Sequence, residues 1–272
     1  MWGGVLRVAV GCFFRKTFET SIVGFRVRAI LLIMILTGCV WAGELRVFSY
    51  NIHHGAGLDE KLDLNRIAEV IKKQKPDLVA LQEVDNRVPR SGKVDQAAEL
   101  AKLLGMHYAY GKCIDLDGGG YGNAILSNYP IQDTIIHKLP GPGEARAVLE
   151  AIIQIQGKKI SFASVHLDWQ KKSTRVEQML AVEKVLSLRN HPVIMAGDFN
   201  AQPDSDTMKL VAKTWSIAAK TGASLTMPAD TPRTEIDYIV HRGLAGAKAS
   251  CLVIEETVAS DHRPLIGVIL LP

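Results

Sequence analysis

The 272-residue chain lacks several features that define other classes of protein. It contains no low-complexity tract, no internal repeat and no Ser/Gly-rich linker, and 47% of its residues are hydrophobic and 22% charged. That composition is typical of a folded globular protein and excludes disorder, collagen and coiled coil. Four cysteines are too few to staple a chain of this length, so a hydrophobic core must stabilise it.

The chain also lacks an excess of charge of either sign outside its first 38 residues. The chain holds 32 Lys and Arg against 28 Asp and Glu, and residues 1–38 contribute five of the cations but only one carboxylate. The remaining residues therefore carry 27 of each sign. This neutrality counts modestly against a non-specific nuclease, which needs several cations that contact phosphates.

The longest uncharged hydrophobic run, residues 29–43, is short for a membrane anchor, because a span needs ~20 apolar residues. With Arg26 and Arg28 before it, the run is typical of a secretory signal, and we expect residues 1–42 to be a leader and the protein to be exported to the periplasm or outside the cell. Residues 36–39 resemble a lipobox, which would place a lipid anchor on Cys39. We favour ordinary cleavage before Gly43, after the small residue Ala42.

The rest of the chain, residues 43–272, is predicted to be one domain because no boundary signal interrupts it. Asp63 can cap a helix whose apolar residues share a face. Further helices are expected at 96–104, 173–188 and near 207–215. Strands are expected at 45–52, 77–84, 107–113, 121–127, 131–139, 145–155, 160–167 and 193–197, and around Ile236, Leu252 and Leu265. This mixture predicts an α/β (α+β) fold: a four-layer sandwich of two stacked, mostly antiparallel β-sheets flanked by helices.

Turn residues at 128–130 and 156–157 predict two antiparallel hairpins. The glycine-rich segment 113–120 is predicted to be a hairpin tip, because no phosphate-loop pattern follows it. Cys113 and Cys251 lie in strand-like runs and are expected to be buried thiols, with a disulfide between them as the alternative.

Polar residues recur where the apolar strands end. Asn51, Glu83, His166 and Asp198 each follow such a run, and Asn200 comes two residues after Asp198. Strand ends that face one crevice are where sites are built. Each residue alone also has a structural interpretation, such as a turn cap or a carboxylate at the rim of the domain.

Taken in order, these residues lie in blocks that resemble the endonuclease/exonuclease/phosphatase superfamily of metal-dependent phosphoesterases. That superfamily includes pancreatic-type deoxyribonucleases, abasic-site endonucleases, neutral sphingomyelinases and inositol polyphosphate 5-phosphatases. The resemblance covers residues 45–271. Its blocks are SYNIHHG (49–55), LVALQEVD (78–85), YGNAILSNYPI (121–131), SVHLD (164–168), AGDFNAQPDS (196–205), EIDYIV (235–240) and SDHRPL (260–265).

By that resemblance Glu83 is the principal Mg²⁺ ligand, with Asn51 beside it and Asp261 as an additional one. An oxygen-rich site of this kind suits Mg²⁺, with Mn²⁺ as the alternative. The resemblance also implies that Asp237 orients His262 toward the phosphate.

In the same family pattern Asp198 orients or deprotonates the attacking water, and either Asp198 or His262 is the formal base. Asn200 donates to the phosphate, and His166 contacts a phosphate oxygen or assists the leaving group. Metal, amide and imidazole would then share the charge of an in-line displacement at phosphorus.

Outside the shared blocks, Arg90 and Arg146 are candidates for binding a second phosphate or an anionic headgroup, or else belong to solvated loops. His53 and His54 are expected at the mouth of the site, where a second metal is a minor alternative. The predicted function is an exported Mg²⁺-dependent phosphoesterase of monomeric form, without an obligate protein partner. Its substrate is a nucleic acid, a membrane-lipid headgroup or a small phosphorylated metabolite. A binding or scaffold module that has lost its chemistry is the alternative.

Overall fold

The computed structural model describes residues 43–271. The predicted leader, its lipobox at 36–39 and Cys39 lie outside these residues. In the part of the chain that is described, no helix is long and apolar enough to cross a bilayer.

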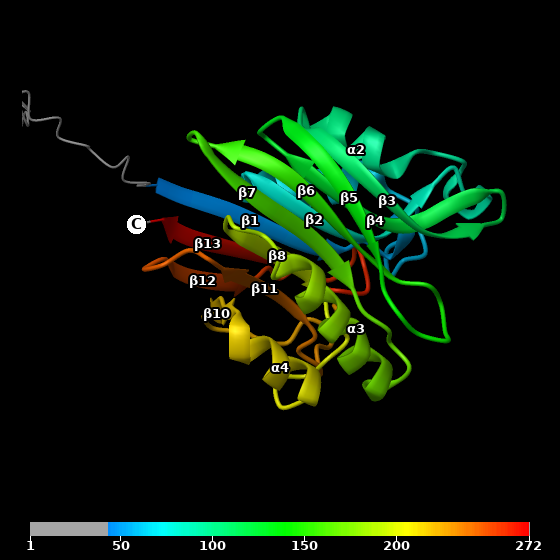
Figure 1. Cartoon of the computed structure of the whole chain (residues 1–272). Coiled ribbons are helices and arrows are strands. Elements are labelled where there is room, and N and C mark those ends of the chain that lie inside the picture. Colours follow the sequence, from blue (N-terminus) through cyan, green and yellow to red (C-terminus); the bar gives the residue numbers. More distant parts are fainter. Residues whose placement is uncertain (1–42, 272) are drawn as a thin grey trace, which may run out of the picture. The chain divides into compact units, whose positions relative to one another are not determined.

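Two β-sheets form the centre of the domain (Figure 1). The first sheet runs, from edge to edge, through β10 (Ala219–Lys220), β12 (Lys248–Val253), β13 (Leu265–Leu271), β1 (Gly43–Asn51), β2 (Leu78–Asn86), β4 (Gly119–Ser127) and β3 (His107–Leu116). The second runs through β5 (Ile131–Lys138), β6 (Ala147–Ile155), β7 (Lys158–His166), β8 (Val193–Asp198), β11 (Asp237–Arg242) and β9 (Ser216–Ile217). Most neighbours are antiparallel, while β1/β2, β7/β8 and β10/β12 are parallel.

Helices cover the outer faces of both sheets and complete four layers, as predicted. α1 (Leu64–Gln74) and α2 (Gln96–Leu104) share an apolar core with the first sheet, and α3 (Lys172–Leu186) and α4 (Asp206–Thr214) share one with the second. A third core fills the space between the sheets, where residues such as Leu78 and Phe162 are fully buried. The predicted cap is confirmed, because Asp63 Oδ1 accepts a hydrogen bond from the Arg66 backbone nitrogen at 2.9 Å.

One of the two predicted hairpins is wrong. The turn at 156–157 joins the antiparallel pair β6 and β7, but the turn at 128–130 carries the chain from β4 in the first sheet to β5 in the second. Asn128 explains the difference, because its backbone nitrogen donates to Asp77 O at 2.9 Å and its side chain donates to Pro76 O at 2.9 Å. These bonds tie the turn to the segment before β2 and leave no β4–β5 pairing.

The segment 113–120 is a hairpin tip between β3 and β4, as predicted. Cys113 lies in the edge strand β3 and Cys251 lies in β12 on the other side of the same sheet, and both are free thiols. The alternative of a disulfide between them is therefore wrong. Burial raises the pKa of the Cys251 thiol to about 12, so it is an inert core residue.

Candidate active site

Strand register alone brings the predicted residues of the second sheet together. His166 lies opposite Asp198 in the parallel pair β7/β8, and Asp237 lies opposite Asp198 in the antiparallel pair β8/β11. In the first sheet, Asn51 ends β1 opposite Gln82 of the parallel neighbour β2, next to Glu83. The two sheets therefore end at one place, and their terminal polar side chains meet there.

Asp198 lies at the centre of this group and is almost fully buried. Its Oδ2 accepts a hydrogen bond from Asn51 Nδ2 at 3.3 Å and lies 3.5 Å from His166 Nε2 and 3.7 Å from His262 Nε2. Burial, and next the carboxylate of Asp237, raises the pKa of Asp198 to about 7. A carboxylate with this pKa is able to exchange a proton near neutral pH.

Asn51 is buried and orders the carboxylates around it. Its Oδ1 accepts a hydrogen bond from the His53 backbone nitrogen at 3.1 Å, and its Nδ2 donates to Glu83 Oε1 at 3.0 Å. The amide nitrogen therefore faces both Glu83 and Asp198. In this arrangement Asn51 holds the carboxylates as a donor, and its predicted role as a metal ligand stays a prediction.

A β-bulge points Glu83 into the site. The pairing of β2 with β4 shifts register between Leu81 and Val84, and Glu83 has a positive φ of 58°. Because side chains of a regular strand alternate between faces, such a bulge re-aims the side chain that it carries. Its neighbour Gln82 turns into the space between the sheets and donates to Ser164 Oγ at 3.1 Å. Glu83 remains partly exposed, so its carboxylate is accessible from solvent, and its predicted role as a metal ligand stays a prediction.

His262 is held by a buried carboxylate. Its Nδ1 lies 3.0 Å from Asp237 Oδ2, and both side chains are at most 5% exposed. Burial opposes the charged ring, but Asp237 outweighs it and raises the pKa of His262 to about 10. The imidazolium is therefore the resting form, with Nε2 directed toward Asp198. Asp261, the preceding residue, is partly exposed.

His166 is neutral and in one tautomer. Burial, and next the charge of Arg146, lowers its pKa well below the ordinary value. The guanidinium of Arg146 can only donate, and its Nη1 lies 2.8 Å from His166 Nδ1, so the ring proton is on Nε2, which faces Asp198. Sequence reasoning left Arg146 open between a ligand of a second phosphate and a residue of a solvated loop. The structure places it in the interior, 5% exposed, with Glu144 as its ion-pair partner at 3.1 Å, so it does not lie in a solvated loop, and its role as a phosphate ligand stays a prediction.

The other predicted residues lie at the edge of this group. Asn200 has a positive φ of 48°, its backbone nitrogen donates to Asp198 Oδ1 at 2.8 Å and its Nδ2 donates to Leu167 O at 3.0 Å. Arg90 is half-exposed and makes a two-bond pair with the buried Asp85 at 2.8 and 2.9 Å. Arg90 also lies over the ring of Tyr121 at 5.4 Å.

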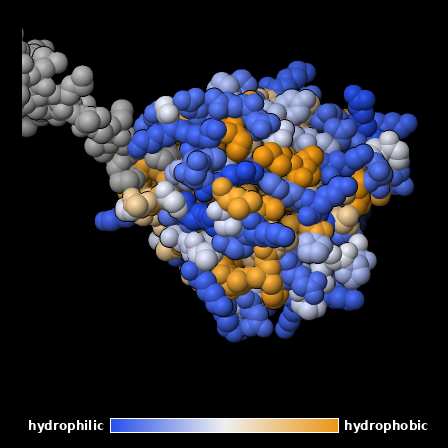
Figure 2. Space-filling view, viewed as in Figure 1, coloured by the Kyte–Doolittle hydropathy of each residue, from blue (hydrophilic) through white to orange (hydrophobic). Residues whose placement is uncertain are grey.

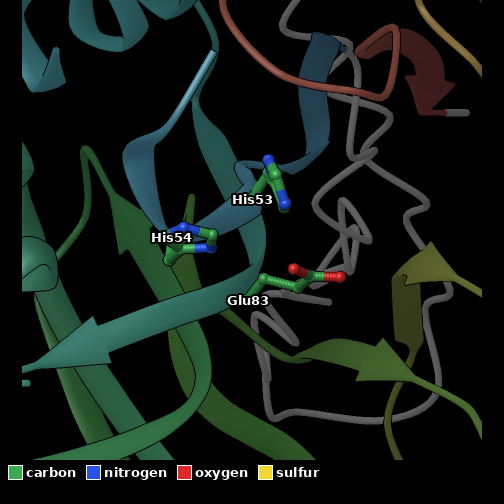
Figure 3. Close-up of side chains that lie close together, drawn as sticks. All are labelled: His53, His54 and Glu83. Carbon is green, nitrogen blue, oxygen red and sulfur yellow. The ribbon is translucent and has the colours of Figure 1, made fainter. Parts of the chain in front are cut away.

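Among residues 43–271, two sets of three side chains place potential ligand atoms within 4.8 Å of one another, close enough to share a metal ion. The first set, Asp198, Asp237 and His262, is buried and already paired internally by the His262–Asp237 bond. The second set is Glu83 with His53 and His54, all partly exposed. Figure 3 shows both imidazoles on the loop after β1, on the same side of the Glu83 carboxylate. Burial, and next the charge of Arg90, lowers the pKa of His54 to about 4.

Sequence reasoning missed two residues that position the site. Ser260 is fully buried, and its hydroxyl donates to the Asn51 carbonyl at 2.7 Å, which ties the loop that carries His262 to the end of β1. Gln96 donates to the His54 carbonyl at 2.6 Å. Ser260 lies in a recognised block and could have been found there, whereas Gln96 stands alone at the start of α2 and carries no motif.

Similarity to known proteins covers most of the domain. The profile of the Endonuclease/Exonuclease/phosphatase family matches residues 48–262. "Uncharacterized protein YbhP" of Escherichia coli (strain K12) is 27% identical over 239 residues, which are 82% of this chain and 94% of that protein. "Inositol phosphosphingolipids phospholipase C" of Schizosaccharomyces pombe is 29% identical over 60% of this chain and 42% of its own length. The solved mannosyl-6-phosphatase Bt3783 of Bacteroides thetaiotaomicron shares the fold, with a TM-score of 0.69 at 18% identity over 84% of this chain and 100% of that one.

Proposed function

We propose, for a chain that belongs to the endonuclease/exonuclease/phosphatase family, that it is a metal-dependent phosphoesterase which cleaves a phosphate ester by in-line attack of water. The single observation that carries this proposal is the convergence on Asp198. Three polar groups from three strands or loops, Asn51, His166 and His262, lie within 3.7 Å of its Oδ2. Such preorganised donors and bases stabilise charge as it develops, which is the main requirement of phosphoryl transfer.

The side chains divide the work by their charge states. Asp198, whose pKa is raised, accepts the proton of the attacking water, and His262, held charged by Asp237, stabilises the phosphate oxygens. His166 offers its Nε2 hydrogen to a phosphate oxygen or to the leaving group. Asn200 has one amide hydrogen bonded to Leu167 O and contributes the other to the substrate.

The residues around Glu83 fit a divalent cation. Glu83 has one carboxylate oxygen bonded to Asn51, is partly exposed, and lies next to other potential ligands. A bound divalent cation would neutralise a phosphate oxygen and polarise the ester. The resemblance of the chain to its family favours Mg²⁺ here, with Asp261 as a further ligand.

The organic part of the substrate would lie next to Asn200. A hollow of about 740 Å³ begins at this residue, and its lining combines polar side chains such as Lys172 and Ser205 with apolar ones such as Val176 and Ile236. On the face shown in Figure 2, hydrophobic patches are broken up by hydrophilic residues. Together with the neutral charge of residues 43–271, these surfaces favour a small polar phosphate ester, such as a sugar or headgroup phosphate, over a nucleic acid.

The test is hydrolysis of four substrates by the purified, metal-stripped protein with Mg²⁺ or Mn²⁺ restored: p-nitrophenyl phosphate, bis-p-nitrophenyl phosphate, plasmid DNA and sphingomyelin. We expect metal-dependent turnover that Glu83→Gln and His262→Gln each reduce by about 100-fold or more. Glu83→Gln should melt close to the wild type, whereas His262→Gln should melt at a lower temperature because it leaves the buried Asp237 carboxylate without its partner. Glu69→Gln, which removes an exposed carboxylate on α1 away from this hollow, is the matched control. Turnover that survives Glu83→Gln would refute the proposal.

Export is proposed from the leader sequence alone. Mass spectrometry of the N-terminus of the mature protein is expected to find Gly43 unmodified. A lipid on Cys39 would instead support the lipobox alternative.

A further inference from the structure

We propose that His53, His54 and Glu83 together form a two-histidine, one-carboxylate site that takes a first-row transition-metal ion, such as Mn²⁺, in preference to Mg²⁺. This inference rests on the proposed function, because Glu83 belongs to both. It goes beyond that function because it assigns ligands outside the oxygen-only set and changes the identity of the metal.

The first argument is that the imidazole nitrogens are available. His53 Nδ1 lies 3.2 Å from the carbonyl oxygen of Ala56, which can only accept, so this nitrogen carries the proton and Nε2 has a free lone pair. Ligating histidines commonly use their other nitrogen in this way. No residue in the described part of the chain makes a hydrogen bond with Nε2 of His53 or with either ring nitrogen of His54.

The second argument is geometric. One nitrogen from each ring and a Glu83 carboxylate oxygen lie within 4.8 Å of one another, and the ring centroids of His53 and His54 are 4.5 Å apart (Figure 3). Three ligand atoms at such separations can surround one ion without large backbone movement.

The third argument is that the backbone is strained to bring both rings to this side. His53 and His54 have φ values of 45° and 46°, a left-handed region that non-glycine residues rarely adopt. Strain of about 1–3 kcal/mol per residue persists where the surroundings enforce it, which is typical of functional sites. Gly55 continues the turn with a φ of 80°, and a Cβ there would lie 2.9 Å from Gln96 Nε2.

Gln96 holds the turn at His53 and His54 in this conformation and connects it to the strand that carries Glu83. Its side chain is buried, donates to the His54 carbonyl at 2.6 Å and accepts from the Asp85 backbone nitrogen at 2.9 Å. Asp85 is two residues after Glu83 on the same strand. One amide therefore fixes the spacing between the histidine turn and the strand that carries the carboxylate.

The ligand chemistry decides the metal. Mg²⁺ prefers oxygen ligands, whereas an imidazole nitrogen binds first-row transition metals, with an affinity that is lowest for Mn²⁺ and rises through Fe²⁺, Co²⁺ and Ni²⁺ to Cu²⁺. Two nitrogen ligands beside one carboxylate therefore shift selectivity away from Mg²⁺. The partly exposed position of all three leaves room on the ion for water and a phosphate oxygen.

The experiment is metal binding rather than turnover. Metal-stripped protein is titrated with Mn²⁺ under electron paramagnetic resonance and with Mg²⁺ by calorimetry, and the Mn²⁺ complex is examined by electron spin echo modulation for coupling to imidazole ¹⁴N. We expect Mn²⁺ to bind at least about 10-fold more tightly than Mg²⁺, with ¹⁴N coupling present.

The variants are His53→Asn and His54→Asn, because asparagine tolerates a left-handed backbone. Each is expected to weaken Mn²⁺ binding by about 10–100-fold and to reduce the ¹⁴N coupling, while Mg²⁺ binding changes little. His107→Asn, which removes an exposed imidazole on β3, is the matched control and should bind Mn²⁺ as the wild type does.

Two results separate failure of this inference from failure of the proposed function. Mn²⁺ bound without ¹⁴N coupling, or with unchanged affinity in both histidine variants, overturns the His53–His54 site even if ester hydrolysis proceeds through Glu83. Absence of any divalent-cation binding in the wild type overturns both.

Discussion

Replacement of Asp237 by asparagine is expected to discharge His262. In the wild type, burial works against the imidazolium, but the Asp237 carboxylate 3.0 Å from Nδ1 raises the pKa of His262 from 6.5 to about 10. Asparagine keeps the shape and removes the charge. We therefore expect the pKa of His262 in the variant to fall well below 10, because only the smaller effects of Asp198 and Asp261 then oppose burial of the charged ring.

The size of the effect follows from the same values. A pKa raised from 6.5 to about 10 corresponds to at most ~5 kcal/mol of stabilisation. Removal of one partner of a buried ion pair costs about 3–5 kcal/mol by independent measure. We expect Asp237→Asn to lower the free energy of unfolding by about 3–5 kcal/mol at pH 7.

The sign of the pH dependence follows from the raised pKa. The folded state holds the proton of His262 more tightly than the unfolded state, so the stabilisation is complete below pH 6.5 and is lost as the pH rises to about 10. The pKa of Asp198 is raised from 3.8 to about 7, so its ionisation lowers the stability of the folded state as the pH rises through that lower range. Measurements from pH 7.5 to about 8.5 therefore report mainly on His262, because at higher pH the buried thiols of Cys113 and Cys251, whose pKa values are also raised, add a dependence of the same sign.

Urea unfolding across that range, with ¹⁵N-detected titration of the histidine rings, tests the prediction. In wild type the free energy of unfolding should fall as the pH rises, and in Asp237→Asn it should be lower at pH 7.5 and fall less steeply. Asp206→Asn, which removes an exposed carboxylate, should follow the wild type. If His262 still titrates near pH 10 in Asp237→Asn, the assigned cause is refuted.

Three further predictions concern other parts of the domain. Burial opposes ionisation of Glu150, but two hydrogen bonds from Arg189 and one each from a histidine and a serine hold the pKa of Glu150 at about 2. Glu150→Gln should therefore lower the free energy of unfolding in urea by about 3 kcal/mol, without loss of activity. In the wild type, that stabilisation is present above pH 4.5 and is lost as the pH falls toward 2. Gly197→Ala should destabilise β8 enough to lower the melting temperature by at least about 10 °C, because its Cβ would lie 1.9 Å from a carbonyl oxygen of β7; an unchanged melting curve would contradict this. Arg146→Met should lower kcat about 10–100-fold at nearly constant KM, because without the Arg146 donor the proton of His166 is no longer held on Nε2. A raised KM with a normal kcat would instead identify Arg146 as a substrate ligand.

The layers of the fold could be predicted because local patterns and layer order agree. Strands whose residues are buried on both faces appear in the sequence as unbroken apolar runs, and Asp63 and the face of apolar residues after it mark α1. The turn at 128–130 could not be predicted, because the same residues suit a hairpin or a crossing between sheets. Its direction depends on hydrogen bonds from Asn128 to a segment 52 residues away.

The candidate site could be predicted as a set of residues but not as a set of contacts. Polar residues at strand ends are visible in the sequence, and parallel register then brings His166 beside Asp198. The interior position of Arg146 and the inward turn of Glu83 depend on tertiary packing and on a one-residue bulge. Gln96 carries no signal, since its role arises only from the carbonyl that it meets.

Because β1 pairs with β13, the candidate site can form only after the last strand of the domain has been synthesised. The hydrogen bond from Ser260 to Asn51 joins residues 209 positions apart, and Gly43 pairs with Leu271 in the same sheet. Contacts of such long sequence separation form late and slowly, because the chain must close a large loop first. A nascent chain therefore carries its carboxylates long before it acquires His262. The group of side chains around Asp198 can therefore be complete only after His262 has been synthesised and its loop has packed against the end of β1.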